Sequence, residues 1–500
     1  MDNSIASDNG NPLSRFGLIA GLVTFVVLIL IGPPAGLLSA GYEADAWVTL
    51  ALLLLMAIWW VSEAVPIPVT SLLPLIVLPL FGVLPIAKVA APYMHPIVVL
   101  LMGGFIFAKA IERWGLHERI ALHVVNRAGG SPMGLIGGFM VASALLSMWI
   151  SNSATSIMMM PIAISVSMAI ENDGDDNQPF TVALLLGIAY ACSIGGLGTP
   201  IGTPTNLIVM GYLSEQNGIE ISFAQWMLLG LPAVGLLLPI AWLVLTKFSF
   251  DLPKLDASAA KEKVSHRLKT LGKISVPERR TLTVFCLIAF MWMFRRLLNS
   301  WEFTLGDVIY TPLSGLTDHM TAIIAVVLCF LIPAGSEKKR GEKLLDWKAA
   351  EEIPWGVLLL FGGGMSLALA ITSSGLSAFI GSGLSIFFSL PIPVLILIVA
   401  LMVLALTEVT SNIATASALM PVLGAIAIET GLPIEMMAAP LALAASCAFM
   451  LPMATGPNAV VFATGKVSLS TMAKTGFKLN LLALAAISLL AYFIAPLALA

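Results

Sequence analysis

Residues 151–161 read SNSATSIMMMP and residues 411–421 read SNIATASALMP, so six of eleven positions are identical. A second pair of matching stretches follows in the same order. Residues 200–206 read PIGTPTN and residues 452–458 read PMATGPN, which share Pro, Thr and Asn. Chance alone would rarely give both matches, so the chain contains an internal repeat built around a polar motif.

The polar motifs lie in a very apolar chain. Of 500 residues, 58% are hydrophobic and only 11% are charged, and the mean hydropathy is +0.97. Soluble globular proteins do not have this composition. Charge-free stretches long enough to cross a bilayer as a helix recur along the chain, and several are long enough for two passes. We expect an all-α polytopic membrane protein.

The basic residues predict the orientation of the spans. Lys and Arg gather in residues 113–127, 247–280, 338–348 and 466–478, and the positive-inside rule makes these segments cytoplasmic. Residues 33–45, 211–222 and 430–435 contain no Lys or Arg, and we expect them outside. Counting crossings from these anchors predicts about eleven spans, with the N-terminus inside and the C-terminus outside.

Three segments between the spans have simpler interpretations. The first apolar run follows Asp2, Asp8 and Arg15 rather than a basic region, so we interpret it as the first span and not as a signal peptide. Residues 112–127 mix charged and apolar residues at helical spacing, which is typical of an amphipathic helix at the membrane interface. The acidic cluster of residues 171–176 indicates a solvated loop.

The repeat is predicted to be inverted. Five crossing segments separate the two motifs, near residues 179–210, 224–246, 281–298, 319–334 and 353–373. Because five is odd, the second unit enters the membrane from the opposite side. Inverted repeats with polar, helix-breaking sequence at matched positions indicate the binding site of a secondary transporter.

The first motif lies near the middle of residues 128–170, which are 43 uncharged residues and too many for one span. Two spans joined by a turn would fit, and so would a re-entrant hairpin whose tip stops at mid-membrane. The repeat favours the hairpin, because two tips of opposite orientation would meet at the centre. Exposed backbone is tolerated there only when it lines a cavity.

These breaks predict an anion site that depends on cations. The prolines of residues 200–206 and 452–458 interrupt two further helices and leave carbonyl groups open. Helix N-termini suit an anion. No Lys or Arg occurs in residues 128–246 or 353–465, so a buried dianion there would lack a basic partner. Bound Na⁺, held by hydroxyl and carbonyl oxygens, is the natural compensation.

With these motifs the sequence resembles the divalent anion/sodium symporter family, the bacterial relatives of the Na⁺/dicarboxylate and Na⁺/citrate cotransporters. The resemblance extends to SEAVPIPVT at residues 62–70, to residues 103–117 and to ASCAFMLP at residues 445–452. It implies an integral protein of the bacterial inner membrane with eleven spans and two re-entrant hairpins. It also implies a homodimer in which transport domains move against scaffold domains as an elevator.

The resemblance implies a division of the chain into five parts. Residues 1–127 would be the scaffold part of the first repeat, and residues 128–247 its transport part. Residues 248–280 would form a basic cytoplasmic linker. Residues 281–380 and 381–500 would be the scaffold and transport parts of the second repeat.

The resemblance also implies the site residues. One sodium site would use Ser147, Ser151, Asn152 and Gly202, and its mirror Thr407, Thr410, Asn412 and Ala454. The substrate would meet Ser151, Asn152, Ser153, Thr203, Ser411, Asn412, Ile413 and Thr455. The family pattern is Ser-Asn-Thr; Ser153 keeps a hydroxyl at the third position, whereas Ile413 does not.

Other polar residues have competing interpretations. Glu408, an intramembrane charge beside the second motif, is either functional or a structural partner of a neighbouring amide or hydroxyl. Lys109, Glu112 and Arg113 are interpreted as a solvated turn at the end of a span. The four cysteines lie in or beside apolar runs and are interpreted as core thiols. We expect no histidine-based metal site and no nucleic-acid partner.

The sequence thus predicts a sodium-coupled symporter of small dianions, foremost C4 dicarboxylates such as succinate, malate and fumarate. Citrate or sulfate as the substrate, and sodium-independent exchange of dicarboxylates, remain alternatives. We expect membrane lipid and the dianion as partners, and Na⁺ with no organic cofactor. A membrane-embedded transferase is disfavoured because the acidic cluster lies in a loop. A channel is disfavoured because paired tips enclose a discrete site.

Overall fold

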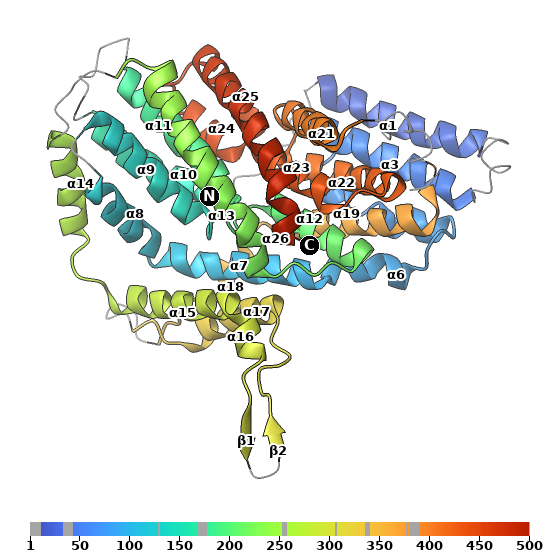
Figure 1. Cartoon of the computed structure of the whole chain (residues 1–500), viewed down its shortest axis with the longest axis horizontal. Helices are drawn as coiled ribbons and strands as arrows, with labels where there is room; N and C mark the ends of the chain where they lie inside the picture. The colour runs from blue at the N-terminus through green and yellow to red at the C-terminus, as the bar shows by residue number, and fades with distance from the viewer. Residues whose placement is uncertain are drawn as a thin grey trace.

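A computed structural model describes residues 12–33, 44–128, 131–168, 170, 178–252, 258–305, 308–335, 341–376, 379 and 390–499. The acidic cluster of residues 171–176 lies outside these residues. The described chain is helical apart from one small β-hairpin, which confirms the predicted all-α class (Figure 1).

The helices of the first half are α1 (Pro12–Ile31), α3 (Ala44–Ser62), α4 (Ile67–Thr70), α5 (Pro74–Leu80), α6 (Ile86–Ala90), η1 (Ala91–Met94), α7 (Pro96–Arg113), α8 (Leu116–Arg127), α9 (Pro132–Ser147), α10 (Asn152–Ser167), α11 (Pro179–Gly196), α12 (Pro204–Asn217), α13 (Phe223–Leu243) and η2 (Val244–Ser249). The second half contains α14 (Ser258–Thr270), α15 (Val276–Met293), α16 (Arg295–Asn299), β1 (Phe303–Leu305), β2 (Val308–Tyr310), α17 (Asp318–Leu331), α18 (Trp347–Glu351), α19 (Trp355–Ser373), α21 (Ile392–Thr407), α22 (Asn412–Thr430), α23 (Glu435–Ala445), η4 (Pro452–Ala454), α24 (Gly456–Phe462), α25 (Leu469–Phe493) and α26 (Ala495–Leu499).

Seven described helical segments are long and apolar enough to cross a membrane. They are Ser14–Ile31, Ala44–Ser62, Ile86–Arg113, Pro179–Gly196, Phe223–Ser249, Trp355–Ser373 and Leu469–Phe493. Six shorter apolar helical segments, of 10–17 residues, lie between them. The chain is therefore a polytopic membrane protein, and the count of eleven spans stays a prediction.

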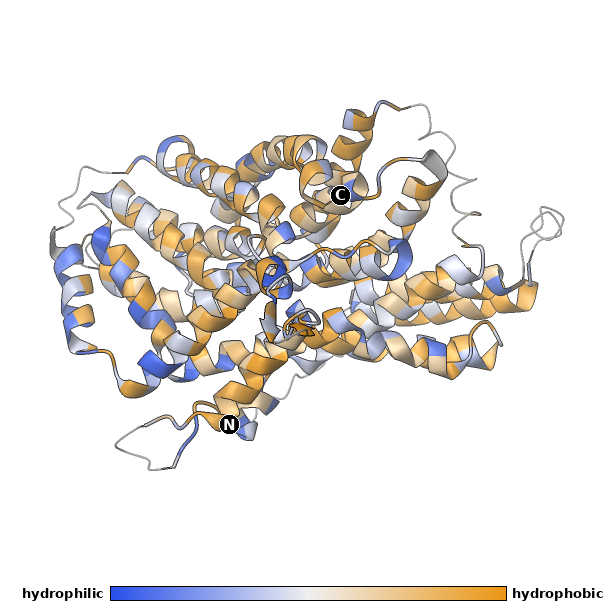
Figure 2. Cartoon of the chain, turned by 60° about the horizontal axis from the view of Figure 1, so that its bottom comes forward, coloured by the Kyte–Doolittle hydropathy of each residue, from blue (hydrophilic) through white to orange (hydrophobic). Residues whose placement is uncertain are grey.

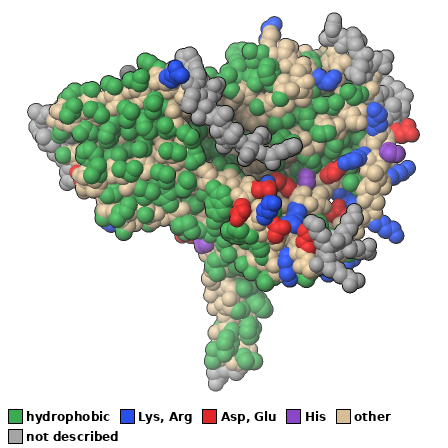
Figure 3. Space-filling view, turned by 180° about the vertical axis from the view of Figure 1, so that it is seen from behind, with side chains coloured by type: hydrophobic (Ala, Val, Ile, Leu, Met, Phe, Trp, Pro, Cys, Tyr) green, Lys and Arg blue, Asp and Glu red, His purple; other side chains and the backbone are tan. Residues whose placement is uncertain are grey.

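Burial separates central from peripheral helices. The spanning window of α11 is 89% buried, whereas that of α1 is only 11% buried. Apolar residues cover most of the chain (Figure 2). In the view from behind, one broad surface is almost free of charge, and Lys, Arg, Asp and Glu gather on a limited area beside it (Figure 3). A charge-free surface of this kind suits contact with lipid hydrocarbon.

The junction between α7 and α8 corrects one predicted boundary. Gly115 has φ of +67°, a left-handed conformation that glycine adopts without steric cost. The chain turns there, so the amphipathic helix is α8, and Glu112 and Arg113 belong to the preceding helix α7. The sequence pattern missed this break because helical spacing continues across it.

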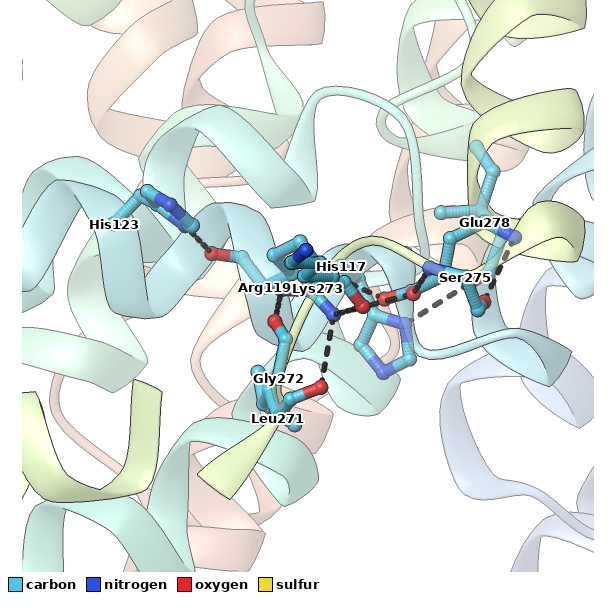
Figure 4. Close-up of polar contacts among 9 residues, drawn as sticks. His117, Arg119, His123, Leu271, Gly272, Lys273, Ser275 and Glu278 are labelled. Carbon is cyan, nitrogen blue, oxygen red and sulfur yellow. Dashed lines mark hydrogen bonds and ion pairs between the residues drawn. The ribbon is translucent and has the colours of Figure 1, made fainter. Parts of the chain in front are cut away.

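Arg119 of α8 bonds to the first turn of α15 and to the segment before it (Figure 4). Its Nε donates to Glu278 Oε1 at 2.8 Å, and its Nη1 donates to the carbonyl oxygen of Gly272 at 2.9 Å. Ser275 and Glu278 form a capping box at the start of α15. Burial disfavours the charged carboxylate, but the bonds from Arg119 and Ser275 outweigh burial and lower the pKa of Glu278.

Two features differ from the sequence expectations or were not anticipated. The hairpin of β1 and β2 projects from the helices (Figure 1), and Phe303 pairs with Tyr310 across it. Cys192, Cys329 and Cys447 are buried as expected, but Cys286 is exposed on α15. Hydropathy does not distinguish a core position from a lipid-facing one, because both are apolar.

We predict that Gly363→Ala destabilises the protein by about 1–3 kcal/mol, as overpacking does. A methyl group at Gly363 would lie 2.2 Å from the carbonyl oxygen of Ser71, a backbone atom that cannot move aside. The matched control is Gly235→Ala, where a methyl group meets nothing within 4 Å. Melting temperatures in detergent should fall only for Gly363→Ala, and equal values for both variants would contradict the prediction.

Candidate functional site

Each sequence motif lies where two antiparallel helices meet. Tip 1, residues 148–151, joins α9 to α10, and tip 2, residues 408–411, joins α21 to α22. Helices α9, α10 and α21 have 16 residues each. At about 1.5 Å per residue each is about 24 Å long, shorter than the roughly 30 Å of a bilayer core.

Each pair of helices packs on one central helix, α9 and α10 on α11, and α21 and α22 on α23. Both central helices are followed by a non-α-helical segment, residues 197–203 after α11 and residues 446–455 after α23. The predicted positions of these breaks were a few residues late. Pro204 and Pro457 lie in the first turn of the next helix, where the missing N–H of proline costs nothing.

The same hydrogen bonds recur at both tips. In the first half, the Ser147 hydroxyl lies within hydrogen-bond distance of two acceptors, Asn152 Oδ1 and the carbonyl oxygen of Cys192, the latter at 2.7 Å. In the second half, the Thr407 hydroxyl has the same two kinds of acceptor, Asn412 Oδ1 at 2.7 Å and the carbonyl oxygen of Ala445 at 2.8 Å. Each hydroxyl has one proton, so it donates to one of its two acceptors at a time. Each motif asparagine is thus held in place by the helix before it and, through the hydroxyl, by the central helix.

The second asparagine of each half also repeats its contacts. Asn206 Nδ2 donates to the carbonyl oxygens of Gly196 and Thr199 at 3.0 and 2.8 Å. Asn458 Nδ2 donates to those of Ala448 and Leu451 at 3.1 and 3.0 Å. Both Oδ1 atoms are buried and have no hydrogen-bond partner among the residues that the structure describes. These asparagines close the gap between the end of one helix and the start of the next.

A single cavity of about 470 Å³ brings the two tips together. All eight residues predicted to contact substrate line it: Ser151, Asn152, Ser153, Thr203, Ser411, Asn412, Ile413 and Thr455. Gly202 and Ala454, predicted for the sodium sites, line it as well. Ser147, Thr407 and Thr410 are not among the lining residues and lie behind the tips. The structure therefore brings these predicted residues to one cavity, where the tips offer hydroxyl, amide and backbone groups.

Near the first predicted sodium site, two oxygen atoms approach Gly196. A methyl group added at Gly196 would lie 2.9 Å from Asn152 Oδ1 and 3.1 Å from the carbonyl oxygen of Gly202. Asn152 Nδ2 lies 3.2 Å from the same point, so two oxygens and one amide nitrogen border the small space that glycine leaves open there. Neutral oxygen ligands suit a hard cation. At the second site, the Thr410 hydroxyl donates to the carbonyl oxygen of Leu406 at 2.8 Å, so that side chain is engaged within the hairpin.

Comparison with known proteins identifies the family. The family model described as "Sodium:sulfate symporter transmembrane region" matches residues 14–499. The chain belongs to this family. The sequence resemblance to the divalent anion/sodium symporters is thereby confirmed.

Relatives that match over nearly their whole length are named as transporters, not enzymes. The chain is 41% identical to the sodium-dependent dicarboxylate transporter SdcS of Staphylococcus saprophyticus, over 96% of this chain and 91% of the relative. It is 39% identical to SdcS of Staphylococcus aureus strain USA300, over 97% and 91%. The crystal structure of the YdaH transporter of Alcanivorax borkumensis covers 90% of this chain and 97% of its own, at 14% identity and a TM-score of 0.57. This last likeness concerns the fold alone.

The two halves of the family site are not identical here. Ser151 caps α10 by accepting from the N–H of Ala154, whereas Ser411 makes no capping bond with its side chain. The first residue of each tip also differs: Met148 follows α9 in the first half, and Glu408 follows α21 in the second. In the first half, the Thr199 hydroxyl donates to the carbonyl oxygen of Met148.

In the second half, the carboxylate of Glu408 links tip 2 to the segment after α23. It accepts from the N–H groups of Phe449, Met450 and Leu451 at 2.8 to 3.2 Å, and from Asn480 Nδ2 at 2.5 Å. Glu408 is 6% exposed and is not among the cavity-lining residues. Of the two interpretations left open by the sequence, these contacts favour the structural one.

The sequence interpretation missed a charged part of the cavity. Lys109, Glu112 and Glu352 line it, although Lys109 and Glu112 had been interpreted as a solvated turn. The signal was present, because Phe105, Ala108, Lys109 and Glu112 have the spacing of one helix face and all four line the cavity. The side chains of Lys109 and Glu112 remain 26% and 23% exposed, and only the packing of α7 shows that they also line the cavity.

We predict that Glu408→Leu destabilises the protein by about 3 kcal/mol, because three backbone N–H groups lose a charged acceptor. Glu408→Gln keeps one acceptor oxygen and should cost less. Thermal melting in detergent should rank the wild type above Glu408→Gln and Glu408→Leu last. A Glu408→Leu variant as stable as the wild type would contradict the anchoring role.

Proposed function

We propose that the protein is a sodium-coupled symporter of small dianions, with C4 dicarboxylates such as succinate, malate and fumarate as its substrates. The observation that carries this proposal is that both Ser-Asn motifs, distant in sequence, line one cavity with Thr203 and Thr455. The SdcS relatives, named as sodium-dependent dicarboxylate transporters, support the same substrate class.

The charge balance explains the need for sodium. The two tips and the segments after the central helices provide only neutral groups to the cavity. A dianion in such a place requires positive charge to offset the loss of hydration. We assign that charge to Na⁺ at two sites, one near Ser147, Ser151, Asn152 and Gly202, the other near Thr407, Thr410, Asn412 and Ala454. The oxygen pair beside Gly196 supports the first.

The proposed mechanism is alternating access by an elevator motion. The tips would be re-entrant hairpins, since helices of 16 residues end before the far side of a bilayer. Transport parts 128–247 and 381–500 would move against scaffold parts 1–127 and 281–380. The protein would work as a homodimer in a bacterial inner membrane, with the N-terminus in the cytoplasm and the C-terminus outside.

Uptake into proteoliposomes tests the coupling. We predict that an inward Na⁺ gradient drives accumulation of labelled succinate, and that replacing Na⁺ by K⁺ abolishes accumulation, because the unpaired dianion then lacks its compensating charge. Unlabelled sulfate and citrate as competitors compare the other dianions. Uptake that ignores the Na⁺ gradient would favour sodium-independent exchange instead.

Substitution of the motif asparagines tests the site. We predict that Asn152→Ala and Asn412→Ala each lower sodium-driven uptake about a hundredfold, since a lost hydrogen bond to a charged group costs up to about 3 kcal/mol. Both variants should elute from size exclusion like the wild type. The control is Asn299→Ala, whose side chain bonds to the carbonyl oxygens of Ser314 and Leu316 away from the cavity. Full uptake by either motif variant would overturn the site.

A further inference from the structure

The cavity between the tips, here called the inner cavity, adjoins a second one. This outer cavity has a volume of about 420 Å³ and is lined by Arg113, Asp346, Lys348 and Ala349 in addition to residues of the inner cavity. Three charged residues line both: Lys109, Glu112 and Glu352. We call these three residues the neck.

The order of residues along two segments places the neck between the cavities. On α7, Phe105 lines only the inner cavity, Lys109 and Glu112 line both, and Arg113 lines only the outer one. From α18 to α19 the order is the same: Lys348 is outer, Glu352 is shared, and Pro354 and Val357 are inner. Lys109 lies one helical turn, about 6 Å, from Phe105. A solute that leaves the inner cavity along these two walls passes the neck.

The ion pairs of the neck are unequal. Lys109 Nζ lies 3.1 Å from Glu112 Oε2, one turn away on the same helix, but 3.8 Å from Glu352 Oε2. The side chain of Glu352 is 65% exposed, whereas those of Lys109 and Glu112 are 26% and 23% exposed. The pair with Glu352 is thus long and open to water, and such pairs contribute little. It is the contact that an incoming carboxylate would replace most easily.

Arg113, one turn further out, is held differently. It bonds to Glu342 and to Asp346, the latter at 2.7 Å from its Nη1. Both of its contacts are short and bind α7 to the segment before α18. Among the described residues that line the inner cavity, Lys109 is the one Lys or Arg.

We propose that Lys109 is a second binding site for the transported dianion, at the mouth of the inner cavity, where a substrate carboxylate takes the place of Glu352. This inference rests on the proposed function and adds a residue to it. The ammonium group has three donors, so it can keep Glu112 and still bind one carboxylate of the solute. Glu112 holds Lys109 in place, and Glu352 competes with the solute.

The neck therefore acts as a relay between water and the neutral tips. A dianion released by the motif asparagines would bind Lys109 before it reaches bulk solvent. Its hydration shell is then lost or regained in two steps, and each step costs less free energy than the whole change at once. Asp346 and Lys348, which line the outer cavity, follow a basic stretch of sequence that the positive-inside rule predicts to be cytoplasmic. The site should thus control affinity on the cytoplasmic side.

Four variants test the relay through the KM for succinate, measured in inverted membrane vesicles, which expose the cytoplasmic side, and in intact cells. Lys109→Gln should raise the KM in inverted vesicles about three- to tenfold, the range expected for one partly exposed charge-assisted contact. Lys109→Arg should restore a KM close to that of the wild type. Glu352→Gln should lower the KM about twofold, because the competing carboxylate is removed. In intact cells all values should stay near the wild type.

The matched control is Lys348→Gln, which removes the same charge from the outer cavity alone, and its KM should change less than about twofold. A wild-type KM for Lys109→Gln, or a shift of Lys109→Gln and Glu352→Gln in the same direction, would overturn the proposal. Wild-type uptake that ignores Na⁺ would overturn the symport alone. The same KM values, taken from exchange against internal succinate, would then still confirm or contradict the Lys109 site.

Discussion

The site depends on one hydroxyl in each half of the chain. The hydroxyls of Ser147 and Thr407 each lie between two acceptors, Oδ1 of the motif asparagine and a carbonyl oxygen of the central helix, and donate their one proton to either of them. This pair of hydroxyl contacts fixes the position of the tip relative to the helix break beside it. Since exposed backbone inside a membrane must be satisfied or line a cavity, the tips, the breaks and the cavity form one constraint rather than three separate features.

The two halves meet that constraint with different residues. In the first half the neutral Thr199 hydroxyl bonds to a backbone carbonyl at the tip, and in the second the Glu408 carboxylate binds three backbone N–H groups. A buried carboxylate with four donors is stable as an anchor, but it adds negative charge to the second half. The two halves of this chain therefore share a geometry, while the charge beside each tip differs.

Local signals in the sequence identified much of the cavity lining but missed its charged part. Repetition of Ser-Asn and of Thr with Asn identified residues that the structure brings into one cavity, because short polar motifs are rare in apolar sequence. The break positions were shifted, since a proline at a helix start and one that ends a helix look alike in sequence. The sequence did not indicate that Lys109 borders the cavity, because charge near a span end usually indicates solvent, and its contact with Glu352 forms only when α7 packs against the segment joining α18 and α19.

The sequence by itself determined that the protein lies in lipid, that it is helical and that it repeats a polar motif. It also determined which kinds of polar group that motif carries. Composition and spacing are enough for this, because they are local properties. The tertiary structure alone decided which oxygens share one space, that Glu408 accepts from four donors, and that a lysine borders the cavity. These are contacts between residues up to about 240 positions apart, such as Lys109 with Glu352. Periodicity carries no information on such distant pairs, since they depend on how whole helices pack.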